Sequence, residues 1–396
     1  MDARTRQNIL RLAIAQALAG GNATVIFATG AIIGATLAPD PALATVPLSV
    51  FVVGMALGTL PAGLLARRFG RRAAFFAGTG SGVCTGLLAA LALLVGSFPL
   101  YTLATFLGGL YAAVVQSFRF AVADGASDAD RPRAVSWVMA GGVFAGVLGP
   151  QLVTWTMDLA PPYTFVPSYL AQAGVALVAM AVLAGVRLPR PVAAASAGRP
   201  LAVIARQPRF ITAVICGVVA YLLMNFLMTS APLAMRMCGL PITASNFAIQ
   251  WHIVAMYGPS FFTGALIARL GAPRVVASGM VLLACAVAAA LSGVTVAHFS
   301  LALILLGLGW NFGFVGASSM VLATHRPEER YRVQSFNDFL VFGTIAVGSF
   351  FSGQILADHG WATVNLVALP PIALALLVLL AAALARHAPV ASRQPP

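Results

Sequence analysis

The chain has 396 residues, of which 60% are hydrophobic and only 8% are charged. About a quarter of the residues in soluble globular domains are charged, so this composition excludes that class and indicates an integral membrane protein. The net charge of +13 comes entirely from Arg, since the chain contains no Lys.

Apolar stretches long enough to cross a bilayer as helices, about 20 residues each, recur along the whole chain. We therefore predict an all-α membrane protein with twelve transmembrane helices. The predicted spans are residues 9–36, 43–66, 72–95, 98–122, 133–156, 164–187, 208–235, 244–268, 273–293, 297–322, 331–356 and 361–385.

The arginines predict the orientation of these spans. All of the 23 basic residues except Arg119 and Arg236 fall near the two ends of the chain or beside every second loop. Loops rich in Arg face the cytoplasm, so both termini are predicted to be cytoplasmic, in a bacterial inner membrane. Because the charge follows the membrane topology, we expect the lipid bilayer as a partner and no nucleic acid.

An internal repeat relates the two halves of the chain. Segment 63–70, after the second span, matches segment 264–271, after the eighth, with a shift of 201 residues. Similarly, Ser136 at the start of the fifth span matches Ser335 at the start of the eleventh, with a shift of 199. The nearly constant shift predicts two bundles of six helices each.

Two six-helix bundles related by an internal parallel repeat are the architecture of the major facilitator superfamily, which the chain resembles. The resemblance implies that the two bundles rock about a central site. The predicted N-terminal bundle covers residues 1–187, and the C-terminal bundle covers residues 208–396. A cytoplasmic linker rich in Pro, Ala and Arg, residues 188–207, lies between them.

The loop after the second span resembles the signature of that superfamily, in which Gly permits close helix approach and an Arg cluster holds the cytoplasmic gate. The Asp that usually precedes the first Arg of the signature is replaced by Arg67. Asp124, at the inner end of the fourth span, is the nearest substitute. The gating residues implied by the resemblance are Gly63, Arg67, Arg68, Gly70, Arg71, Arg72 and Asp124.

Soft metal ligands gather in the seventh and eighth spans. Met224 and Met228 are four residues apart, as are His252 and Met256, so each pair shares one helix face. Thioether sulfur and neutral imidazole suit Cu(I), although Met is also a common filler of apolar cores. The candidate copper ligands are Met224, Met228, His252 and Met256, with Met235, Met237 and Cys238 as a funnel at the outer mouth.

Within the superfamily, this pattern resembles the CcoA-like copper importers. The resemblance implies import of copper, as Cu(I), by alternating access, in support of haem-copper oxidase assembly. It also implies a monomer without a cofactor, with copper chaperones as possible partners.

Close relatives of those importers are riboflavin transporters, and we keep riboflavin or another small aromatic solute as the alternative substrate. Trp251 and Trp310 support it, because indole rings can stack on a flat organic molecule. A drug–proton antiporter is a further alternative, since Gly142, Gly146 and the pair Gly149–Pro150 resemble a motif of those proteins.

Arg119 and Asp338 are charged residues predicted to lie within spans, where an ionisable residue is a functional candidate by default. Arg119 could pair with Asp338, reach the cytoplasm or contact an anionic substrate. Asp338 is the natural candidate for proton coupling. The chain lacks the G-x-S-x-G and H-E-x-x-H motifs and the phosphate-binding loop, so we predict that it is not an enzyme.

Overall fold

The computed structural model describes residues 3–40, 43–44, 46–188 and 198–387. Every regular element within these ranges is a helix, which confirms the all-α prediction. The N-terminal half contains α1 (Ala3–Leu37), α2 (Val46–Phe69), α3 (Arg71–Val95), α4 (Phe98–Gln116), α5 (Phe118–Asp124), α6 (Arg131–Thr156) and α7 (Val166–Ala184).

The C-terminal half begins after a short linker helix, α8 (Leu201–Ala205), which lies within the predicted linker. The remaining elements are α9 (Pro208–Met237), α10 (Ile242–Tyr257), α11 (Ser260–Leu270), α12 (Ala272–Leu291), α13 (Val296–Trp310), the π-helix η2 (Asn311–Val315), α14 (Gly316–Leu322), α15 (Arg330–Leu366) and α16 (Leu369–His387).

Among the described residues, ten helices are long and apolar enough to cross a membrane, and the bent pair α10 and α11 adds an eleventh span. The last two predicted spans meet in α15, where Gly360 has the non-helical angles φ 76° and ψ 177°. The number of twelve spans and the cytoplasmic placement of the termini stay predictions.

Breaks inside two predicted spans are local features that hydropathy does not detect. The fourth span divides at Ser117 into α4 and α5. The eighth bends by 41° between α10 and α11, next to Pro259, whose ring nitrogen cannot donate a helical hydrogen bond. Asn311 of η2 donates to the carbonyl oxygen of Met256, 2.6 Å away, and to Ser260 Oγ, 2.7 Å away. Its side chain therefore supplies hydrogen bonds at the bend.

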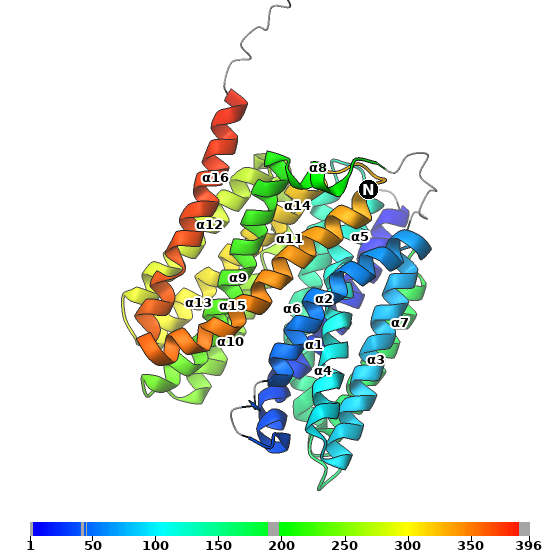
Figure 1. Cartoon of the computed structure of the whole chain (residues 1–396), viewed down its shortest axis with the longest axis vertical. Helices are drawn as coiled ribbons and strands as arrows, with labels where there is room; N and C mark the ends of the chain where they lie inside the picture. Colours follow the sequence, from blue (N-terminus) through cyan, green and yellow to red (C-terminus); the bar gives the residue numbers. More distant parts are fainter. Residues whose placement is uncertain (1–2, 41–42, 45, 189–197, 388–396) are drawn as a thin grey trace, which may run out of the picture.

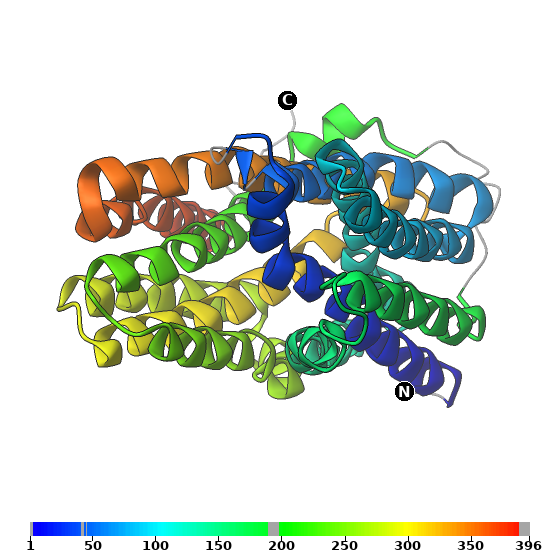
Figure 2. The ribbon, with the colours of Figure 1, turned by 90° about the horizontal axis from the view of Figure 1, so that it is seen from below.

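The two halves stand side by side as separate bundles of helices (Figure 1). The N-terminus, α8 and the end of α16 lie at the same end of the molecule, which we call the inner end. Figure 2 shows the two bundles from below, that is, from the end opposite the inner end. A common end for both described termini is consistent with the even number of spans that the Arg pattern predicts.

Two glycines related by the sequence repeat allow helices of the two halves to approach closely near the inner end. A Cβ atom placed on Gly63 of α2 would lie 1.7 Å from Ser335 Oγ of α15, and one on Gly264 of α11 would lie 2.6 Å from Arg133 Cα of α6. Both contacts cross between the halves. The repeat therefore corresponds to a pair of equivalent close approaches, and together they close the inner end.

Candidate functional site

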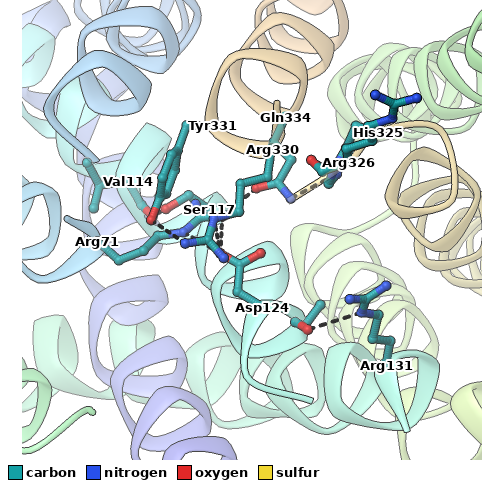
Figure 3. A network of polar contacts seen from close by, with 11 residues as sticks. Arg71, Val114, Ser117, Asp124, Arg131, His325, Arg326, Arg330, Tyr331 and Gln334 are labelled. Carbon is teal, nitrogen blue, oxygen red and sulfur yellow. Dashed lines mark hydrogen bonds and ion pairs between the residues drawn. The ribbon is translucent and has the colours of Figure 1, made fainter. Parts of the chain in front are cut away.

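A network of charged and polar side chains lies beside the Gly63 contact (Figure 3). Arg71 of α3 donates hydrogen bonds from Nε and Nη2 to Asp124 Oδ2, at 3.0 and 2.9 Å. Arg71 Nη2 also donates to Gln334 Oε1 of α15 in the other half. Asp124 therefore forms an ion pair with Arg71, and its role as a substitute for the missing signature Asp stays a prediction.

The C-terminal half contributes two further groups to this network. The Nε atom of Arg330 lies 3.7 Å from Asp124 Oδ2, so Asp124 faces arginines from both halves. The ring of Tyr331 is stacked by two guanidinium groups, with Arg71 Cζ 5.0 Å and Arg330 Cζ 4.7 Å from its centroid. We call Arg71, Asp124, Arg330, Tyr331 and Gln334 the inner gate.

The other signature arginines lie outside the inner gate. Arg67, Arg68 and Arg72 are exposed, and the guanidinium groups of Arg68 and Arg72 stack on Phe69 and Phe76 of their own helices. Gly70 has φ 90°, a conformation that only Gly adopts readily, and it allows the sharp turn from α2 to α3.

An ion pair fastens the end of the linker to the loop before α15. Arg199 donates from Nε to Glu329 Oε1 at 2.8 Å and from Nη2 to Glu329 Oε2 at 2.6 Å. Hydrogen bonds from Arg199, and then from the backbone of Arg326 and Arg199, lower the pKa of the buried Glu329 to about 2. The carboxylate therefore stays charged at neutral pH and holds the linker to the C-terminal half.

Arg119 of α5 forms an ion pair across the interface between the halves, with an acid one helical turn after Gln334 of the inner gate. Its side chain is fully buried, and Nη2 lies 2.5 Å from Asp338 Oδ1 of α15. Nε donates to Ser318 Oγ of α14 at 3.1 Å, and Nη1 donates to the carbonyl oxygen of Gln116 in its own span. An arginine of the N-terminal half is thus paired with an acid of the C-terminal half, as burial in a membrane requires.

Arg119 stacks on one aromatic ring from each half, with Cζ 4.3 Å from the ring centroid of Phe120 in its own helix. The same Cζ atom lies 4.7 Å from the ring centroid of Phe314, which stacks on Trp310 with centroids 5.3 Å apart. Tyr221 packs edge-on against both, and Tyr257 against Trp310. Among the described residues, the buried Nε1 atom of Trp310 has no hydrogen-bond partner. We call Tyr221, Tyr257, Trp310 and Phe314 the aromatic cluster.

Gln116 links this cluster to the N-terminal half. Its Nε2 atom donates to Tyr221 Oη at 3.3 Å, so α4 and α9 meet beside Arg119. The sequence analysis did not select Gln116, Tyr221, Tyr257 or Phe314. Gln116 could have been suspected from its position one helical turn before Arg119, but aromatic residues are too common in apolar spans to stand out.

The proposed copper ligands lie on α9, on α10 and at the end of α9, and among the described residues the buried Nε2 atom of His252 has no hydrogen-bond partner. His252 is buried, and its Nδ1 atom lies 2.7 Å from the carbonyl oxygen of Leu303 in α13, so its polar contact is with α13 and not with α9. Met224 and Met256 are buried, and Met228 is half-buried against the core. Of the three funnel residues, Met235 is buried, whereas Met237 and Cys238 are exposed.

Within the described ranges, no three His, Cys, Asp or Glu side chains lie close enough together to hold a metal ion; methionine sulfur is not among these ligand types. The two tryptophans proposed to stack on an organic solute also separate. Trp310 belongs to the aromatic cluster, but Trp251 is 46% exposed and packs edge-on against Phe247. Trp310 is thus joined through Phe314 to Arg119, whereas Trp251 is not part of this group.

The structure is similar to several solved transporters. The human organic anion transporter MFSD10 (TETRAN) matches with a TM-score of 0.80 and 14% identity, covering 96% of this chain and 100% of that one. The proton:xylose symporter XylE matches with a TM-score of 0.77 and 13% identity, covering 96% of each chain. At these identities, the likeness supports the fold alone.

The sequence has nearer relatives. It is 47% identical over 379 residues to the riboflavin transporter RfnT of Brucella anthropi, covering 95% of each chain. It is 29% identical over 380 residues to the uncharacterized MFS-type transporter YdeG of Bacillus subtilis, covering 91% of this chain and 88% of that one. The model of the Major Facilitator Superfamily matches residues 12–259. Since this match covers more than half of the chain, the protein belongs to the Major Facilitator Superfamily.

Proposed function

We propose that this protein transports riboflavin, or a closely similar flat aromatic solute, across the inner membrane by alternating access. The observation that carries the proposal is the 47% identity to a protein named as a riboflavin transporter, over 95% of both chains. This relationship favours the alternative substrate over copper. No observation in the described part of the chain brings the Met and His side chains of α9 and α10 together in support of copper.

The interface beside Arg119 suits such a substrate chemically. The aromatic cluster offers ring faces, on which a flat ring system can stack with centroids about 4.5–7 Å apart. The unpartnered Trp310 Nε1 is a hydrogen-bond donor, and flavins carry ring carbonyl groups that can accept from it. Arg119 and Gln116 add donors from the opposite half. A substrate held between these groups contacts both halves, as alternating access requires.

The ion pair of Arg119 and Asp338 must break during the transport cycle, and breaking it costs free energy. When the inner end opens, α5 moves away from α14 and α15, and the pair separates. An unpaired buried charge is costly, so a proton must neutralise Asp338 and a substrate group must compensate the charge of Arg119. We therefore assign Asp338 the role of proton acceptor. Arg119 pairs with Asp338 when that acid is charged and with the substrate when it is protonated.

Uptake of radiolabelled riboflavin tests the proposal. Bacteria that require riboflavin and lack their own transporter should accumulate it only when this protein is expressed. Trp310→Leu should lower the initial rate by about tenfold, because base-like ring stacking contributes roughly 1–3 kcal/mol per ring. Trp251→Leu is the matched control and should leave the rate unchanged, since Trp251 lies outside the cluster.

The same cells distinguish copper from riboflavin. Copper accumulation should not depend on expression of the protein, and replacing both Met224 and Met228 by Leu should preserve riboflavin uptake. Expression-dependent copper uptake that disappears in this double variant, with no riboflavin uptake by the parent, would reverse the assignment.

A further inference from the structure

A small buried cavity lies inside the N-terminal half, between α1, α4 and α7. Three polar side chains line it, Asn22, Tyr111 and Gln172, and its other lining residues are apolar or Gly. The three side chains are at most 2% exposed. Within the described ranges, Asn22 Nδ2, Asn22 Oδ1, Tyr111 Oη and Gln172 Oε1 have no hydrogen-bond partner. So many unpaired polar atoms around one cavity are unusual in a folded protein.

We infer that this cavity binds one water molecule. Its open space is about the size of a single water, and a buried water typically makes about three hydrogen bonds to otherwise unpaired groups. The water can donate to Asn22 Oδ1 and Gln172 Oε1, and it can accept from Asn22 Nδ2 and Tyr111 Oη. It thereby joins α1 to α4 and α7, so that these helices move together when the halves rock.

Removing the hydroxyl group of Tyr111 tests this water site, because the melting temperature should change in opposite directions with and without a bound water. In a dry cavity, Tyr111→Phe removes an unpaired polar atom and the melting temperature of the purified protein should stay the same or rise. With a bound water it should fall, as it should for the control Tyr101→Phe, whose hydroxyl contacts Tyr169 Oη at 2.7 Å. We expect the fall.

A double variant makes the test specific for a bridging molecule. Tyr111→Phe and Gln172→Met remove two groups that the water would connect, so their combined effect should be smaller than the sum of the single effects. Additive effects, or a melting temperature of Tyr111→Phe at or above that of the parent, would overturn the water site.

A second inference concerns His325, in the loop between α14 and α15. Arg71 has only hydrogen-bond donors, so the atom of Gln334 that faces it must be Oε1, as observed. Gln334 Nε2 is then a donor, and it lies 3.2 Å from His325 Nε2. The Nδ1 atom of His325 lies 3.2 Å from the carbonyl oxygen of Arg326, which only accepts. The closed inner gate is therefore compatible with neutral His325, protonated on Nδ1.

A proton on His325 Nε2 conflicts with this arrangement. The new N–H group would face the amide N–H₂ of Gln334, donor against donor. Rotating the Gln334 amide to present Oε1 to His325 would turn its N–H₂ group toward Arg71, where no acceptor remains. The first outcome replaces the hydrogen bond between Gln334 and His325 by repulsion, and the second also removes the hydrogen bond between Arg71 and Gln334 that joins the two halves at the inner gate.

We propose that His325 is a pH sensor that opens the inner gate when the cytoplasmic side becomes acidic. The charged groups facing it are Asp124, which favours the protonated ring, and Arg71 and Arg131, which oppose it. Arg330 lies beside the same Asp124 carboxylate. Burial, ahead of these charges, lowers the pKa of His325 in the closed gate. Since opening relieves the burial, the open state binds the proton more tightly, and acid shifts the equilibrium toward opening.

Distance measurements by electron spin resonance test this inference without substrate, and so separately from the proposed function. Spin labels at Phe69→Cys in α2 and Arg274→Cys in α12 report the separation of the halves at the inner end, in a variant whose native Cys residues are replaced by Ala. The population with the longer distance should grow as the pH is lowered from 8 to 5.5. This range brackets the ordinary pKa of His, about 6.5. Each unit of pKa difference between the states corresponds to about a tenfold change in their ratio.

Three variants decide the mechanism. His325→Gln cannot titrate in this range and should show a distance distribution independent of pH. Gln334→Leu keeps the titrating ring but lacks the connection to Arg71, and it should also lose the response. His298→Gln, which changes a histidine that contacts Thr295 far from the gate, should behave like the parent. A parent without a pH response, or a response that persists in His325→Gln, would overturn the proposal.

Discussion

Replacing Arg119 by Leu is expected to lower riboflavin uptake by more than tenfold and to reduce the amount of folded protein in the membrane. The substitution leaves Asp338 as a buried carboxylate without its cation. Removing one partner of a buried ion pair typically costs about 3–5 kcal/mol, which is a large part of the stability of most proteins. Uptake rates and the yield of monodisperse protein after detergent extraction measure the two effects.

A double substitution separates stability from transport. Arg119→Gln with Asp338→Asn removes both charges and keeps hydrogen-bonding groups, so the yield of folded protein should recover while uptake stays low. Arg236→Leu is the control, because Arg236 is exposed. Normal uptake by the double variant would contradict a role for the pair in transport and leave it a purely structural contact.

Gly63→Ala is expected to lower uptake by preventing full closure of the inner end. The added Cβ atom would lie 1.7 Å from Ser335 Oγ and 2.6 Å from Ser335 Cβ, so the helices must move apart. Overpacking of this kind costs about 1–3 kcal/mol, and here the cost falls only on the closed state. Such a difference corresponds to a change of about 5- to 150-fold in the ratio of the two states.

The neighbouring helix offers a matched control. A Cβ atom on Gly80 of α3 meets no atom within 4 Å, so Gly80→Ala should transport like the parent. Ser335→Gly should restore uptake to Gly63→Ala, since it removes both atoms nearest to the new methyl group. Failure of this rescue, with normal protein yield, would show that the close approach of α2 and α15 does not limit transport.

Structural features that follow from local physical constraints could be predicted from the sequence. A bilayer-spanning segment must be apolar over its whole length, and its backbone must satisfy its own hydrogen bonds, so composition alone predicted a helical membrane protein. A charge inside a span must have a partner, which made the pairing of Arg119 with Asp338 foreseeable. The repeat of Gly63 as Gly264 predicted two related bundles, and the structure adds that both glycines stand where helices of the two halves approach closely, as small residues permit.

The rotation of each helix and the identity of its neighbours were decided only by the tertiary structure. Spacing by four residues placed His252 and Met256 on one face, but it could not show that His252 contacts α13 rather than α9. In the same way, Trp251 and Trp310 were equivalent in sequence, yet one is exposed and the other is buried and stacks on Phe314. In a span that is apolar on all sides, hydropathy has no preferred face, so packing against the other helices determines which side chains reach the centre.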